Sequence, residues 1–79
     1  MSNERKIQCV CSNLRRILNA YVDFSQYRNG DFKLKIKMKE YPLCYVYQFT
    51  KYQVTSTFSK ELTRWVLTYL TNKLLCDMC

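Results

Sequence analysis

The sequence contains no histidine, one glycine and one proline in 79 residues. Without histidine, the chain lacks the usual general base, the usual partner of a catalytic nucleophile and the commonest metal ligand. A single glycine excludes a glycine-rich phosphate-binding loop. The six acidic residues are scattered and form no pair suited to acid–base chemistry. We therefore expect a protein that is not an enzyme and that carries no cofactor.

Long hydrophobic runs are also absent. Arg15 and Arg16 interrupt the first apolar stretch, which falls short of the roughly 7–15 residues of a signal-peptide core and of the ~20 needed to span a membrane. We expect a protein that is not secreted, that has no membrane partner and that lies in the cytoplasm, or in the nucleus if its source is eukaryotic or viral. The five cysteines agree with reduced thiols, because an odd number does not fit a closed disulfide framework.

The residues that are present favour a folded, basic protein. Hydrophobic residues make up 48% of the chain and aromatic residues 15%, which is typical of a packed core rather than of disorder. The length predicts one small domain over residues 1–79, without room for a large internal pocket. The chain has 13 Lys and Arg against 6 Asp and Glu, a net charge of +7. A positive field of this size favours polyanionic partners, most often nucleic acid.

Hydrophobic periodicity predicts a helix, followed by a hairpin. Residues 3–19 place apolar side chains on one helical stripe, and Ser2 or Asn3 is suited to cap the first turn. Residues 21–27 alternate and are joined through Asn29-Gly30 to a second alternating run, which predicts two strands and a type I′ turn. The alternative extends the helix through Tyr21 and lets Gly30 end a loop.

The rest of the chain predicts two further strands and a closing helix. Residues 32–39 alternate between apolar and lysine side chains, and Pro42 marks a turn. Residues 43–58 favour extended structure, with a bend or bulge near residues 48–53. Ser59 is expected to cap a last helix whose apolar stripe consists of Leu62, Trp65, Val66, Tyr69, Leu70 and Leu74. The fold class is α+β, in the order α-β-β-β-α, with two helices packed on one face of a small antiparallel sheet.

This order of elements resembles that of double-stranded-RNA-binding domains. Those domains use a Gly-Pro-x-His loop and a Lys-Lys-x-x-x-Lys cluster that opens the last helix. Here there is no histidine, and the last helix opens with Ser59-Lys60-Glu61-Leu62-Thr63-Arg64. The resemblance is confined to topology, so it implies no functional residue.

The clearest candidate site is the set of lysines at alternate positions of the central strand. We call Lys33, Lys35, Lys37 and Lys39 the lysine ladder. Neighbouring members lie about 6.6–6.8 Å apart on one face of a strand, comparable to the spacing of phosphates along a nucleic-acid strand. The ladder is therefore a candidate phosphate-binding stripe. The alternatives are a solvated face, a strand edge made lysine-rich to prevent pairing with other chains, and a docking site for an acidic protein.

The neighbouring aromatic residues have two interpretations. If residues 43–58 pair without a change of register, Tyr45, Tyr47, Phe49 and Lys51 lie beside the lysine ladder, where rings can stack on single-stranded bases. A bulge reverses the assignment and places the same three rings in the core, which is the commoner situation for aromatic residues in strands.

The cysteines first suggest a four-thiolate zinc site made by Cys9-x-Cys11 and Cys76-x-x-Cys79. Three strands between the helices make the two helices parallel, so the start of the first lies far from the end of the second. A helix of about 18 residues is about 27 Å long, too far for thiolates that bind one ion at about 2.3 Å. We expect no metal site, and Cys11 is explained as a core residue on the apolar stripe.

Together these features predict a small, non-catalytic nucleic-acid-binding protein with weak sequence specificity. The candidate binding residues are Lys33, Lys35, Lys37, Lys39, Lys51, Tyr45, Tyr47, Arg15 and Arg16, where Arg15 and Arg16 form a second basic region with Arg28. The alternative is an interaction module or inhibitor of the virus or mobile-element type, which binds an acidic surface of a host nucleic-acid enzyme. A second copy of the chain is a further candidate partner, because small proteins with an exposed strand edge often self-associate.

Overall fold

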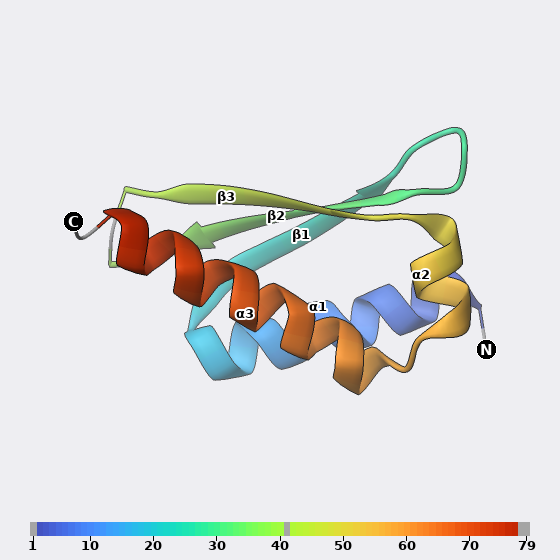
Figure 1. The fold of residues 1–79 in the computed structure, drawn as a ribbon, viewed down its shortest axis with the longest axis horizontal. Coiled ribbons are helices and arrows are strands. Elements are labelled where there is room, and N and C mark those ends of the chain that lie inside the picture. Colours follow the sequence, from blue (N-terminus) through green and yellow to red (C-terminus); the bar gives the residue numbers. More distant parts are fainter. Residues whose placement is uncertain (1, 41, 78–79) are drawn as a thin grey trace.

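The computed structural model describes residues 2–40 and 42–77, which form two helices and a short third one against a three-stranded sheet (Figure 1). The elements are α1 (Asn3–Leu18), β1 (Ala20–Gln26), β2 (Phe32–Met38), β3 (Cys44–Phe49), α2 (Lys51–Ser56) and α3 (Ser59–Asp77). The sheet is antiparallel with the order β1-β2-β3, and α1 and α3 cover one of its faces. The predicted fold class is confirmed, with α2 as an addition between β3 and the last helix.

Local signals at both ends of α1 explain its bounds, and they confirm the helix predicted over residues 3–19. The Ser2 hydroxyl accepts a hydrogen bond from the Arg5 amide at 3.3 Å and so caps the first turn. Asn19 ends the helix in the left-handed conformation, at φ 50° and ψ 48°, which asparagine tolerates better than most residues. Ala20 then begins β1 directly.

The predicted hairpin is confirmed, but its turn differs from the expected type. The Gly30 amide donates to the Tyr27 carbonyl, and the Tyr27 amide donates to the Asp31 carbonyl. Gly30 has φ 95°, whereas Asn29 keeps a negative φ. A type I′ turn needs positive φ at both central residues, so the structure instead shows the pattern of a type I turn followed by a glycine bulge.

The predicted extension of the third strand to Phe58 is wrong, because the chain enters α2 after Phe49. Thr50 and Gln53 form a capping box, in which each side chain accepts from the other residue's backbone amide, at 3.1 and 2.8 Å. At the other end of α2, the Lys6 ammonium from α1 donates to the Val54 carbonyl. This short helix is thus held at both ends, and it carries Val54 fully into the core.

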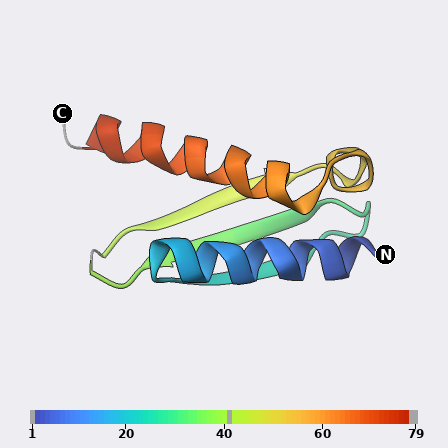
Figure 2. The ribbon, with the colours of Figure 1, turned by 90° about the horizontal axis from the view of Figure 1, so that it is seen from below.

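The last helix lies where it was predicted, with two corrections. Ser59 is its first helical residue rather than its cap, and the amides of Glu61 and Leu62 donate to the Phe58 carbonyl. Leu62, Val66 and Leu70 are buried, as the apolar stripe predicts, whereas Trp65 retains 36% of its exposure. Figure 2, which views the molecule from the side of the helices, shows that α1 and α3 run in the same direction.

The register between β2 and β3 decides which side chains enter the core. Tyr45, Tyr47 and Phe49 pair with Ile36, Leu34 and Phe32, respectively. Directly paired residues of antiparallel strands share a face, so the three rings point toward the helices. Phe49 is fully buried, Tyr45 is 8% exposed and Tyr47 packs against the core cluster.

Candidate nucleic-acid interface

The face of the sheet that the helices leave open, called the open face below, presents nine side chains in three rows. Each row runs from β1 through β2 to β3, and the strand pairings define the rows as Tyr21–Lys37–Cys44, Asp23–Lys35–Val46 and Ser25–Lys33–Gln48. The lysines form the central column, because they occupy the alternate positions of the middle strand. This confirms the predicted strand over residues 32–39, with Phe32, Leu34 and Ile36 fully buried on its other face.

Few acidic groups lie near the lysines of the central column. In residues 2–40 and 42–77, no ion pair within 4 Å involves Lys33, Lys35 or Lys37. Asp23 is directly opposite Lys35 and is the one carboxylate among the nine side chains of the open face. Three ammonium groups therefore stand on one strand beside a single acid, which leaves a local positive excess.

Lys39, the last member of the lysine ladder, lies beyond the end of β2, and its ammonium group already has partners within the protein. Its ammonium donates to the Asn19 side-chain oxygen at 3.2 Å and lies 5.0 Å from the centroid of the Tyr21 ring. Tyr21 is 59% exposed and belongs to the open face. It is the one aromatic side chain among the nine of the open face, and sequence reasoning did not single it out.

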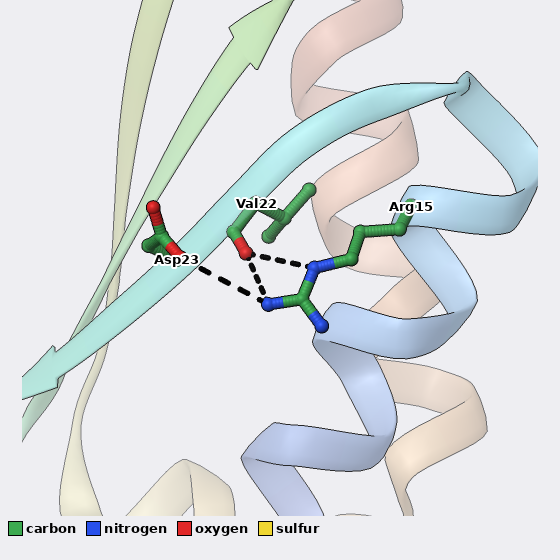
Figure 3. Close-up of polar contacts among 3 residues, drawn as sticks. All are labelled: Arg15, Val22 and Asp23. Atoms are coloured by element: carbon green, nitrogen blue, oxygen red, sulfur yellow. Dashed lines mark hydrogen bonds and ion pairs between the residues drawn. The ribbon is translucent and has the colours of Figure 1, made fainter.

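Arg15 is held at the edge of the sheet rather than pointing freely into solvent (Figure 3). Its guanidinium donates to the Val22 carbonyl from Nε at 3.0 Å and from Nη2 at 2.6 Å. The same Nη2 lies 3.9 Å from a carboxylate oxygen of Asp23. Arg15 thus covers a carbonyl of an edge strand, which limits pairing with another chain, and it offsets the only acid of the open face.

Tyr45 and Tyr47 do not lie beside the lysine ladder, so their assignment as stacking groups is corrected. The Tyr47 ring makes edge contacts with Phe49 and Tyr69, at centroid distances of 4.7 and 5.1 Å, and Tyr69 in turn donates to the Val46 carbonyl. Burial, and secondarily the neighbouring Tyr69, raises the pKa of the Tyr47 hydroxyl above 10.0. Because the strand ends at Phe49, the positions of Val54 and Phe58 carry no information about its faces.

Lys51 is also displaced from the open face, since it is the first residue of α2. Its backbone amide donates to the Asp31 carboxylate at 2.9 Å, and its ammonium lies 5.3 Å from the centroid of the Tyr52 ring. Lys51 therefore packs beside the β1–β2 loop instead of extending the lysine ladder.

The expected second basic region is not a single surface. Arg15 contacts β1, Arg16 lines a groove between α1 and α3, and Arg28 lies in the β1–β2 loop. The neighbours Arg15 and Arg16 diverge because successive helical residues point about 100° apart.

The open face is positively charged and contains a shallow, open depression. Tyr21, Asp23, Lys35 and Lys37 line an open depression of about 400 Å³. Lysine ammonium groups bind phosphate oxygens as point charges, and they contribute position rather than base recognition. This arrangement is suited to binding an anionic ligand by charge.

The cysteines are separated as the parallel helices predict. Cys9 and Cys11 lie near the middle of α1, whereas Cys76 is the second-to-last residue of α3, a helix that ends far from the start of α1 (Figure 1). Within the described residues, no group of three or more His, Cys, Asp or Glu could hold a metal ion. Cys79, the last member of the proposed zinc set, lies outside the described residues. Burial raises the pKa of the Cys11 thiol from 9.0 to about 11, which fits its place in the core.

Comparisons with protein-family models, with curated proteins and with solved structures give no match to this chain. Across the described residues, no helix has the length and apolar character that crossing a membrane requires. The candidate interface therefore depends on the residues of the open face themselves.

Proposed function

We propose that the protein binds nucleic acid through the phosphate backbone, with the lysine ladder of the open face as its contact surface. The observation that carries the proposal is the central column of Lys33, Lys35 and Lys37, exposed or half-buried beside a single carboxylate. Like charges held at this spacing repel one another, and a polyanion offsets that repulsion while it releases its own counterions.

The same face predicts weak sequence specificity. Base stacking needs exposed rings, and Tyr21 is the one aromatic side chain of the open face, because Tyr45 and Tyr47 point toward the helices. A flat face also presents no helix or paired ribbon that could enter the major groove and read base edges. Contacts are therefore expected with phosphates and sugars, which fix a strand without reading its sequence.

Fluorescence anisotropy with labelled single-stranded and double-stranded DNA and RNA tests the proposal. Three phosphate contacts predict a slope of log K against log salt of about −2 for single strands and about −3 for a duplex. The affinity for a single strand then falls by roughly 20-fold between 50 and 200 mM salt. In the variant with Lys33, Lys35 and Lys37→Gln, binding is expected to be weak and almost independent of salt.

A matched control separates the lysine ladder from net charge. The control variant replaces Arg5, Arg28 and Lys73 with glutamine. It removes the same number of charges, from exposed positions that are not among the nine side chains of the open face. This control variant is expected to retain most of the affinity and the slope. Equal losses in both triple variants would show attraction by net charge alone, and absent binding at low salt would overturn the proposal.

The burial of the tyrosines also favours a second candidate, in which the lysine ladder docks on an acidic protein surface such as that of a nucleic-acid enzyme. A face with charge and few exposed rings suits carboxylates as well as phosphates. Absent nucleic-acid binding together with capture of an acidic protein that the Lys33, Lys35 and Lys37→Gln variant fails to capture would favour this role. Either role is compatible with the proposed cytoplasmic or nuclear location, where exposed thiols such as Cys44 remain reduced.

A further inference from the structure

A second basic surface lies on the helix-covered side of the sheet, away from the lysine ladder. α1 and α3 border a groove of about 360 Å³, and three of the side chains that line it are cations, namely Arg16, Lys60 and Arg64. All three are exposed. Among the described residues that line the groove, none is acidic.

The cations of this groove are not used by the fold. In the described part of the chain, the ion pair within 4 Å joins Arg15 to Asp23 and involves none of the three groove cations. Arg16 and Arg64 come from different helices, so the groove presents two guanidinium groups from opposite walls. Guanidinium groups bind carboxylates through two parallel hydrogen bonds, which suits them to an acidic ligand.

The groove also has an aliphatic component. Ile17 from α1 is 52% exposed, and Leu67 from α3 is partly buried against the core. Ile17 belongs to the apolar stripe that the sequence predicts for the first helix, yet the core leaves half of it uncovered. No aromatic side chain lines the groove, so it offers no ring on which a nucleic-acid base could stack.

We propose that the groove between α1 and α3 binds an acidic segment of a partner protein, with an aliphatic side chain seated on Ile17 and Leu67. Carboxylates on either side of that aliphatic residue pair with Arg16, Arg64 and Lys60. The combination of cations from both helices with aliphatic lining residues distinguishes this ligand from a nucleic acid, which supplies charge without an aliphatic group. The proposal is independent of the lysine ladder, because it uses other residues on the other side of the sheet.

Nuclear magnetic resonance titration of the full chain tests the proposal. The probe is the capped peptide Asp-Glu-Leu-Glu-Asp, and the control peptide has serine in place of leucine. Addition of millimolar probe is expected to shift the methyl signals of Ile17 and Leu67 and the side-chain NεH signals of Arg16 and Arg64. The control peptide is expected to bind about fivefold more weakly, because it cannot bury a leucine side chain, and an open groove covers only part of such a side chain.

Two variants locate the binding. The variant Arg16→Gln with Arg64→Gln is expected to bind the probe peptide about fivefold or more weakly, because it loses two exposed ion pairs, each of which contributes a small amount. The variant with Lys33, Lys35 and Lys37→Gln is expected to bind the peptide as tightly as the unmodified protein. A failure of nucleic-acid binding at the open face can therefore be distinguished from a failure of peptide binding at the groove. The proposal is overturned if the shifts are absent, if they map to the open face, or if both peptides bind equally. It is equally overturned if a single-stranded oligonucleotide shifts the groove signals and the peptide does not.

Discussion

Val46→Tyr is expected to add a second aromatic ring for base stacking to the open face, where Tyr21 is the one aromatic side chain among the nine. Val46 lies on β3 directly opposite Lys35, in the middle row, and half of its side chain is exposed. A ring at this position stands beside the central lysine column, which is where Tyr45 and Tyr47 would lie if β3 were shifted by one residue. Such a shift moves every side chain of a strand to the other face.

The expected gain follows from one stacked base. Stacking of a base on an aromatic side chain contributes about 1–3 kcal/mol, which corresponds to a roughly 5- to 150-fold tighter complex. The gain applies to single strands, since the bases of a duplex are already stacked on one another. The stability of the protein is expected to change by less than about 0.5 kcal/mol, because the site is a half-exposed strand position.

Anisotropy titrations with a single-stranded oligonucleotide and its duplex measure this difference. Val46→Leu is the matched control, because it adds apolar area without a ring. In the converse variant, Tyr47→Leu, the contacts with Phe49 and Tyr69 are lost, so stability falls while the folded fraction keeps its affinity. A Val46→Tyr variant that binds single strands no better than Val46→Leu refutes the reasoning, and so does a Tyr47→Leu variant that folds stably but loses binding.

Three further predictions concern the Thr50 cap of α2, the Asp23 carboxylate of the open face and the buried Cys11 thiol. Thr50→Ala removes the capping box at α2 and is expected to cost about 1 kcal/mol, or about 4–8 °C in Tm. The control Thr68→Ala, at an exposed position inside α3, is expected to be neutral or slightly stabilising because alanine has the higher helix propensity, and equal Tm values for the two variants would contradict the role of the cap. Asp23→Asn removes the single carboxylate among the nine open-face side chains and is expected to tighten nucleic-acid binding about twofold to fivefold at low salt, with unchanged affinity as the contrary result. Because the pKa of the Cys11 thiol is raised from 9.0 to about 11, the unfolded state binds fewer protons between these values, and stability falls as pH rises from 9 to 11. Urea unfolding at pH 8 and pH 10.5 measures this loss, which is expected to shrink in Cys11→Ala and would be refuted by equal pH dependence in both proteins.

The parts of the fold that follow from periodicity could be read from the sequence. The stripe of α1, the alternation of β2 and the Asn-Gly turn each depend on neighbours within one element, and the structure confirms the helix, the strand and the hairpin. The lysine ladder follows from the same alternation. The sequence could not show that Lys33, Lys35 and Lys37 face only one carboxylate, because the position of Asp23 opposite Lys35 depends on the register of β1.

The end of β3 was predictable in principle. Thr50-x-x-Gln53 is a capping-box pattern, and reading it would have ended the strand at Phe49 and removed Val54 and Phe58 from the assignment of faces. With those two excluded, the rings at alternate positions 45, 47 and 49 are the largest apolar set and belong in the core. Extended-structure propensity outweighed this signal because Tyr, Val and Thr dominate the segment.

The groove between α1 and α3 was beyond the reach of sequence alone. Arg16 and Arg64 are far apart in the chain, and they line the same groove because both helices pack in parallel on the same face of the sheet. The sequence suggested instead that Arg16 joins Arg15 and Arg28. Helical geometry and the attachment of Arg15 to β1 separate these three side chains.

The most direct test of the proposed nucleic-acid interface uses the cysteines as position markers. Cys44 lies on the open face opposite Lys37, whereas Cys9 and Cys76 are exposed on the helices. Alkylation of the reduced protein, followed residue by residue with mass spectrometry, compares the three rates with and without saturating oligonucleotide. The account predicts slower alkylation of Cys44 in the complex and unchanged rates at Cys9 and Cys76. Protection of Cys9 or Cys76 with Cys44 unaffected would contradict it, because the nucleic acid would then lie on the helices and not on the lysine ladder.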